Sequence, residues 1–481
     1  SYALIKLKGS TNVEKNENEA ITRLTTCSEN HPGATYQLAT YYKNSLKNKE
    51  IIHALDDDEE EKEDELKREE LRKSTEKKAA ELFEKASNNG IIDSMGDFAI
   101  CLLRGKGCEA NAEQALKLLN ESSELGSAHS TYLLAKCYLN GEGVTEDKVK
   151  AVQLLRTAHS GGCISATYLL AHCLHQFEGV GPEGYSGETL EQSRELFDIA
   201  VKKGHATAAY ELGMIYNQNG EIFAYKQKAA TLFEIAANQN YPQAITELGI
   251  LYETGSGVQK DGQKAFKLYR KANKLGDLQS IYHLGMCYLK EIGTEKDVEK
   301  GRDLLEQAVS ININSAKTQL GILYKDGIGG PKDESKAVEL FKQAADNNDV
   351  EAKYQLGLCL FDGIGIAADR SKAIRFFVDA RKEDHTEASY LLAKIYMYGI
   401  NARKNIEEAV NIFKHLVNRK KHVPSMYELG KHYVENSNTE KLSKGISLLE
   451  RAEQNEYPDS FNLLGNCYLK GIGVVLDVKK A

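Results

Sequence analysis

One short pattern recurs along this chain at a nearly constant interval. A small residue and a tyrosine are followed by Leu, then Gly or Ala, then an aromatic residue, as in "SAHSTYLLAKCYLNGEGV" from Ser127. The Gly/Ala position falls at Ala99 and again at Ala135, 36 residues later. Further copies place it at Ala171, Gly213, Gly249, Gly285, Gly321, Gly357, Ala393, Gly430 and Gly465. A repeat of roughly 20 to 50 residues indicates a stack of small structural units rather than several separate cores.

The interval departs from 36 residues at a few places. It is 42 residues between Ala171 and Gly213, where a Gly-rich loop (178–187) is inserted. The last two intervals are 37 and 35 residues. An earlier copy at Ala39 lies 60 residues before Ala99, which predicts a long insertion there.

We interpret the chain as about thirteen repeats whose outer two are incomplete, and therefore as a fragment of a longer protein. The predicted divisions are an incomplete first repeat (1–30), a repeat with a long acidic insertion at 44–76 (31–90), repeats with the Gly-rich loop (91–204), regular 36-residue repeats (205–384) and C-terminal repeats of which the last is truncated (385–481).

Each repeat is predicted to form two helices, here called the first and the second helix. In the first helix, Ala208, Leu212 and Tyr216 are spaced to share one face, and in the second Ala337 and Phe341 do the same. The small Gly or Ala of the first helix allows close approach, and an aromatic side chain fills the neighbouring gap. Prolines suit the first turn of a helix and glycines its end. These residues are Pro32, Pro242, Pro424 and Pro458 at predicted starts and Gly126, Gly204 and Gly276 at predicted ends.

A Gly-rich stretch within this pattern resembles a damaged phosphate-binding loop. In "GSGVQKDGQK", Gly257 and Gly262 have the spacing of that loop, but Gln263 and Lys264 follow where Lys and Ser/Thr are needed. A helix rather than a strand is predicted before it, and paired glycines recur at the same repeat position elsewhere. We therefore predict a tight turn between two helices, with glycines in the left-handed region.

The sequence "ELGILYETGSGVQKDGQKAFKLYRKANKLG" resembles the Sel-one-like repeat family, which is related to tetratricopeptide repeats. The resemblance covers essentially the whole chain. It implies an all-α, right-handed superhelical solenoid of about thirteen stacked antiparallel helix pairs, the first and last incomplete. It also implies an adaptor or scaffold, as in ubiquitin-ligase complexes at the endoplasmic reticulum, in the regulation of cell-wall synthesis, or in bacterial secretion and virulence.

Composition excludes some classes of function. The net charge of −8 and the pI near 5.9 give no overall attraction to nucleic acid, and no apolar run is long enough to span a membrane. Nine cysteines cannot all pair within one chain, and six of them share one repeat position with Leu and Ile, which predicts burial. This favours a reducing, cytoplasmic location; the alternative is the lumen of the endoplasmic reticulum, if a signal peptide was removed.

No catalytic motif stands out, so we expect no enzyme activity, no cofactor and no metal site. The expected function is a protein–protein interaction scaffold that holds a partner peptide or helix in the concave groove of the solenoid. Two alternatives stay open: a structural component of a large assembly, and a regulatory arm of an enzyme complex such as a ubiquitin ligase.

The predicted binding residues lie on the first helices of five consecutive repeats. A tyrosine two positions before the recurring Leu is followed, one turn later, by an apolar residue in the central repeats, whereas flanking repeats carry residues such as Lys136 and Lys394. The predicted residues are Tyr210, Met214, Ile250, Tyr282, Met286, Ile322, Tyr354 and Leu358. Such a stripe suits a peptide groove, but the same residues could pack between neighbouring first helices.

The insertion contains "DDDEEEKEDE" at 56–65. It is expected to form an acidic loop that runs into an elongated, solvated helix. Its functional alternative is an anchor for a basic partner.

Overall fold

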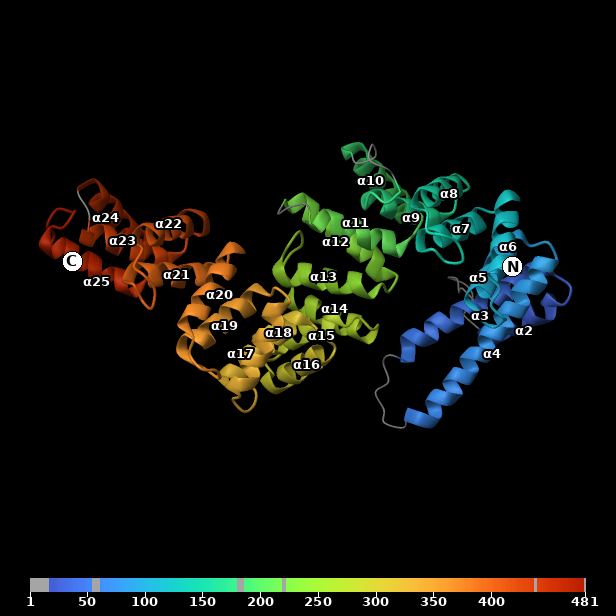
Figure 1. The fold of residues 1–481 in the computed structure, drawn as a ribbon, viewed down its shortest axis with the longest axis horizontal. Coiled ribbons are helices and arrows are strands. Elements are labelled where there is room, and N and C mark those ends of the chain that lie inside the picture. The colour runs from blue at the N-terminus through green and yellow to red at the C-terminus, as the bar shows by residue number, and fades with distance from the viewer. Residues whose placement is uncertain (1–16, 54–60, 180–185, 219–221, 437–438, 480–481) are drawn as a thin grey trace. The chain divides into compact units, whose positions relative to one another are not determined.

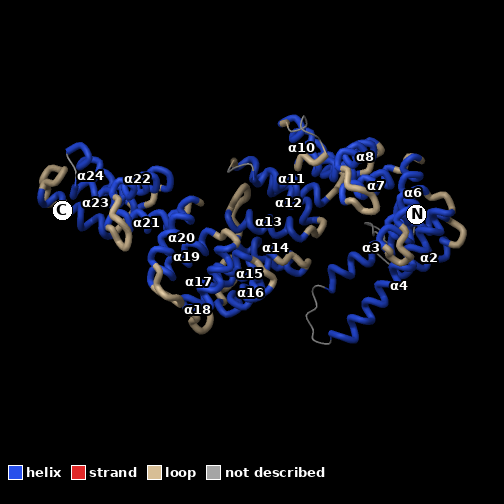
Figure 2. Tube along the Cα trace, in the orientation of Figure 1, coloured by secondary structure: helices blue, strands red, loops and turns tan. Residues whose placement is uncertain are grey.

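The computed structural model describes residues 17–53, 61–179, 186–218, 222–436 and 439–479, and all regular elements within these ranges are helices (Figure 2). The side chains of residues 17–19, 46–53, 61–68 and 439–440 are not described. The prediction of an all-α fold is confirmed. The start of the first predicted repeat and residues 180–185 of the Gly-rich loop lie outside the described residues.

The helices form two compact units, which are described separately. Unit 1 comprises residues 1–280 and 292–294. Its helices in chain order, labelled in Figure 1, are α2 (Glu17–Ser28), α3 (Pro32–His53), α4 (Glu61–Asn88), α5 (Ile92–Arg104), α6 (Ala112–Glu124), α7 (Ala128–Asn140), α8 (Lys148–Ser160), α9 (Ile164–His175), α10 (Gly187–Lys202), α11 (Ala206–Gln218), α12 (Phe223–Asn238), α13 (Pro242–Thr254) and α14 (Gly262–Lys274).

Unit 2 comprises residues 281–291 and 295–481. Its helices are α15 (Gln279–Lys290), which begins two residues before the unit, α16 (Val298–Ser310), α17 (Asn314–Asp326), α18 (Glu334–Asp346), α19 (Val350–Asp362), α20 (Arg370–Lys382), α21 (Thr386–Tyr398), α22 (Ile406–His415), the π-helix η2 (Leu416–Lys420), α23 (Val423–Asn436), α24 (Thr439–Gln454) and α25 (Pro458–Lys470). In both units the odd-numbered α-helices are the predicted first helices and the even-numbered ones the second helices.

Close approach of the two helices in a repeat explains the small residue of the pattern. Between α11 and α12, a Cβ atom built on Gly213 would lie 2.6 Å from the Phe233 ring, and Gly321 stands in the same relation to Phe341 between α17 and α18. Both phenylalanines are fully buried. The predicted pairing of a small residue with an aromatic one is therefore confirmed in these repeats, where it builds the core. At Gly285 the facing side chain is instead Leu305.

The stretch that resembles a phosphate loop is a turn between α13 and α14. Gly255 ends α13 with φ 77°, and Gly257, with φ 72°, packs so closely on the preceding second helix that a Cβ atom would lie 2.3 Å from the Lys226 carbonyl carbon. The Asp261 side chain accepts a hydrogen bond from the Lys264 backbone N–H and so caps α14. This carboxylate occupies the helix N-terminus that a phosphate would need.

Other details of the sequence pattern are also confirmed. Pro32, Pro242 and Pro458 are the first residues of their helices, and Pro424 is the second residue of α23. Gly126, Gly204 and Gly276 have positive φ after second helices. Of the six cysteines at the shared position, Cys137, Cys173, Cys287, Cys359 and Cys467 are buried and Cys101 is half-buried.

The acidic insertion lengthens both helices of its repeat. α3 extends to His53, within the predicted insertion at 44–76, and α4 begins at Glu61. Residues 54–60 lie outside the described residues, as do the side chains up to residue 68. The proposed acidic anchor at 56–65 therefore stays a prediction.

A single extra residue accounts for the 37-residue interval before Gly430. The second helix of that repeat changes to a π-helix at η2, which is followed by Lys421 with φ 51°. One inserted residue widens the backbone ring from i→i+4 to i→i+5. The next first helix, α23, then begins in its normal register.

Candidate functional site

The predicted binding residues of unit 1 are only partly exposed. The Tyr210 ring lies 6.0 Å from the ring of Phe233 in the same repeat and 5.2 Å from that of Tyr241, which precedes α13. Tyr210 and Met214 pack against a cluster of buried residues, and Ile250 is half-buried. These contacts join one first helix to the next.

The same tyrosine contacts recur in unit 2. The Tyr354 ring lies 6.1 Å from the Phe377 ring and 4.7 Å from the His385 ring, which caps α21. Tyr282 lies edge-on to His283 at 5.2 Å. Packing between first helices, one of the two interpretations of the tyrosines, is therefore a role that Tyr210 and Tyr354 perform.

The apolar stripe of unit 2 is uneven. Met286 is 5% exposed and belongs to the core, so it offers almost no area to a partner in this conformation. Ile322 and Leu358 are half-buried and pack against the same core.

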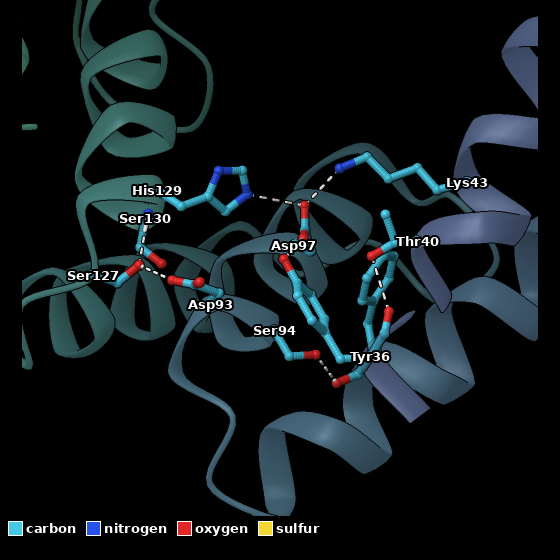
Figure 3. Close-up of polar contacts among 10 residues, drawn as sticks. Tyr36, Thr40, Lys43, Asp93, Ser94, Asp97, Ser127, His129 and Ser130 are labelled. Atoms are coloured by element: carbon cyan, nitrogen blue, oxygen red, sulfur yellow. Dashed lines mark hydrogen bonds and ion pairs between the residues drawn. The ribbon is translucent and has the colours of Figure 1, made fainter. Parts of the chain in front are cut away.

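A different cluster of polar side chains surrounds Asp97 in unit 1. Asp97, on α5, is 4% exposed. Lys43 of α3 donates to its Oδ1 atom at 2.5 Å, and Tyr36 of the same helix donates to Oδ2 at 3.1 Å. His129 of α7 places Nε2 3.3 Å from Oδ1. Figure 3 shows that Lys43 and His129 approach this carboxylate from opposite sides. Three consecutive first helices thus meet at one buried charge.

Asp97 is ionised in this environment. Burial opposes ionisation, but the hydrogen bond with His129 and the charge of Lys43 outweigh it, so the pKa of Asp97 lies below its ordinary value. Burial and the Asp97 charge raise the pKa of the Tyr36 hydroxyl, which stays protonated and donates. Burial also raises the pKa of the Cys101 thiol to about 12, so this thiol is a poor nucleophile at neutral pH.

A glycine opens the space beside this cluster. Gly96 occupies the position at which most first helices carry the tyrosine of the pattern. A Cβ atom there would lie 2.4 Å from Ser130 Oγ on α7, so no larger residue fits without displacement. The start of α7 is held by Ser127, which caps this helix and whose hydroxyl donates to Asp93 of α5 at 2.6 Å (Figure 3).

A pocket of about 420 Å³ lies against the cluster. It is lined by residues of the first helices α3, α5, α7 and α9 and of the second helix α4. Phe83, Ile100 and Leu133 supply apolar surface. Lys43, Arg104, Lys106, Lys136 and His129 supply basic groups, and Glu76, Asp97 and Glu142 supply carboxylates. Four Lys/Arg residues therefore outnumber three carboxylates, in a chain whose net charge is −8.

The basic groups of the pocket already have partners of different strength. Arg104 forms a two-nitrogen contact with Glu142, with N···O distances of 2.9 to 3.3 Å. Lys106 lies 3.8 Å from Glu76, and the Lys136 ammonium lies 5.9 Å from the centre of the Tyr132 ring. The ion pairs at the rim are partly exposed and contribute little to stability.

The sequence pattern did not reveal this site, because only the tyrosine position and the residue one turn later were compared between repeats. Asp97 stands directly after the tyrosine position. The structure shows which repeat positions meet. Lys43 reaches Asp97 just as Lys325 reaches Gln355 in the corresponding pair of repeats in unit 2, at 2.8 Å. Once it is known that these two repeat positions meet, the sequence signal for the site is Asp97 next to Gly96, which replaces the tyrosine of the pattern.

The described residues contain neither a candidate metal site nor a helix that could span a membrane. No three or more His, Cys, Asp or Glu side chains within those ranges gather in a way that could hold a metal ion. No helix of the described part combines the length and apolarity needed to cross a bilayer.

Comparison with known proteins identifies the repeat. A family model described as "Sel1 repeat" matches residues 71–91, 94–127, 128–162, 206–241, 242–277, 278–311, 314–349, 350–381, 386–414 and 461–481. Among curated proteins, none matches.

A solved structure with a similar fold is that of a protective antigen present in uropathogenic Escherichia coli strains, which displays an SLR fold. The two are 22% identical with a TM-score of 0.62, over 83% of this chain and 85% of that one. A Sel1 repeat protein from Oxalobacter formigenes is 26% identical over 51% of this chain and 99% of its own, with a TM-score of 0.45.

Proposed function

This chain belongs to the Sel1 repeat family, and on that premise we propose that it is a non-catalytic scaffold or adaptor that holds a partner peptide or helix against its first helices. Solenoids of this kind typically mediate protein interactions, because stacked repeats present an extended surface. The observation that carries the finer proposal is the pocket around Asp97. It is lined by four consecutive first helices and combines apolar surface with placed polar groups.

The predicted stripe supplies a second proposed contact region. In unit 1, Tyr210, Met214 and Ile250 keep part of their surface exposed while they pack between helices. Ile322, Tyr354 and Leu358 do the same in unit 2. A partner could contact their exposed edges, although the buried Met286 would contribute little. We keep this region as a proposal secondary to the pocket.

Two alternatives predict different contact surfaces. A structural component of a large assembly would be contacted on several faces, and a regulatory arm of an enzyme complex, such as a ubiquitin ligase, would hold one enzyme. We propose the scaffold function because most residues that line the pocket around Asp97 lie on first helices. We also propose a cytoplasmic location rather than the lumen of the endoplasmic reticulum. It is supported by the nine cysteines, all within the described ranges, none of which is joined in a disulfide. Cell fractionation tests the location.

Photo-crosslinking tests the contact surface. A photoreactive phenylalanine analogue replaces Ile100, which lines the pocket, or Lys117, which is exposed on the second helix α6. We expect one partner to be crosslinked in cells from Ile100 and not from Lys117. Equal crosslinking of several proteins from both positions would favour the structural component and contradict the proposal.

A further inference from the structure

We propose that the pocket around Asp97 binds a carboxylate of an acidic peptide segment. The inference rests on the proposed function and adds the chemistry of the partner. A pocket of about 420 Å³ is much larger than a single ion and accommodates a few side chains. Because the pocket is lined by both apolar and charged side chains, a ligand that fits it must carry both apolar groups and a charge.

The charges of the pocket favour an anion. The buried Asp97 carboxylate compensates Lys43, so these two groups contribute little net charge to the opening. Arg104, Lys106 and Lys136 then face two carboxylates, Glu76 and Glu142. The pocket opening therefore has a net positive charge, which attracts an acidic peptide segment and repels a basic one.

The Arg104 contact shows that a carboxylate fits at the rim. Glu142 approaches two nitrogen atoms of the guanidinium group, which is the geometry that arginine offers to carboxylates. The side chains of Arg104 and Glu142 are 41% and 32% exposed. Because water already solvates this pair in part, a ligand carboxylate can replace Glu142 at small cost.

Contacts within the chain position the other polar groups of the pocket. Asp97 fixes Lys43 and His129, which come from α3 and α7 (Figure 3). Phe83, Ile100 and Leu133 provide the apolar surface beside them. A peptide with an apolar residue next to Asp or Glu would cover this surface and bring its carboxylate to Arg104 and Lys136. Because Asp97 holds Lys43 and His129 by hydrogen bonds, these side chains lose less entropy on binding than unrestrained ones would.

The test selects peptides and then changes their charge. A phage-displayed library of random octapeptides is selected on the purified full chain, and the best sequence is synthesised with a fluorescent label. We expect the selected sequences to be enriched in Asp or Glu beside apolar residues. Exchange of Glu for Gln, or Asp for Asn, in the peptide should weaken binding about ten-fold. An amidated C-terminus shows whether the terminal carboxylate takes part.

Variants locate the binding site. Arg104→Gln with Lys136→Gln should raise the Kd about ten-fold or more. The matched control, Lys117→Gln with Arg156→Gln, changes the same charge on exposed second-helix positions and should leave Kd within about two-fold. Circular dichroism checks that both variants are folded.

The possible failures are distinguishable. Selected peptides without acidic residues, or equal loss with both double variants, overturn the carboxylate site. If Ile250→Asp abolishes binding while Arg104→Gln with Lys136→Gln does not, the site is wrong and the scaffold function stands. If no peptide is enriched over an unrelated solenoid protein, the carboxylate site and the peptide-binding function both fail.

Discussion

At the scale of the residue, four glycines on first helices each face an aromatic ring; they are Gly213, Gly249, Gly321 and Gly357. The Cβ atom of an alanine at Gly213 would overlap the Phe233 ring, which is fully buried and cannot turn aside. At Gly33, near the start of α3, no atom lies within 4 Å of the added Cβ. The same substitution therefore has opposite consequences at the two positions.

We expect Gly213→Ala to lower the free energy of unfolding by about 1–3 kcal/mol, the usual cost of overpacking a core. Gly33→Ala should be neutral or stabilising by up to about 1 kcal/mol, since it restricts the unfolded chain. Urea unfolding followed by circular dichroism measures both. Equal effects would show that helix propensity, rather than the ring contact, governs the glycine position.

Asp97 should make the free energy of unfolding depend on pH in the acidic range. Its pKa is lower in the folded chain than the unfolded value of about 3.9. Its ionisation therefore contributes stability above that value and loses it as the pH falls toward the folded pKa. We expect the difference in unfolding free energy between the natural chain and Asp97→Asn to shrink below about pH 4. Urea titrations at several pH values measure it.

A double variant provides the control for this prediction. Other repeats carry Leu at the position of Asp97, as at Leu133. Lys43→Met with Asp97→Leu removes both charges and should recover most of the stability that Asp97→Ala loses, because a buried pair is costly to break but not to replace. A difference between the natural chain and Asp97→Asn that stays the same down to pH 3 would show that the carboxylate is not the source.

At the scale of the element, much of each repeat was predictable. Helix spacing, the starts at Pro242 and Pro458, and the turn at Gly255 and Gly257 all follow local rules that the sequence displays directly. The burial of Met286 was not, because it depends on which neighbouring helix covers each face. The site around Asp97 depends on pairing between repeats and was missed for the same reason.

The π-helix η2 gives an element-scale prediction. Deletion of Asn418 should convert the π-turn to regular helix and restore a 36-residue interval. We expect the midpoint of thermal unfolding to stay the same or rise, because α-helical hydrogen bonds replace π-helical ones. Deletion of Asp379 from the regular helix α20 should instead destabilise by about 2 kcal/mol or more, since it displaces buried Ala380 from its face. Equal losses would mean that η2 is not a tolerated insertion.

At the scale of the whole molecule, the contacts are local along the chain. Among the described residues, every pair of elements with substantial contact lies close together in chain order. Stacks of this kind gain stability from each repeat and from its neighbours, so they have no single core. Such an organisation explains why the sequence reveals the architecture more readily than the binding site.

Truncation tests this local organisation. We expect a fragment of residues 1–277, which contains α2 to α14, to keep helical circular dichroism per residue and to unfold cooperatively. A fragment with the spectrum of an unfolded chain would show that stability requires contacts beyond neighbouring repeats.

The most direct test of the central claim compares amide hydrogen exchange in this chain with and without the partner that crosslinking recovers. The account predicts slower exchange in the first helices α5 and α7, which carry Asp97, Arg104 and Lys136, and unchanged exchange in the second helices α6 and α8. Protection that falls on α6 and α8 while α5 and α7 exchange as before would contradict it.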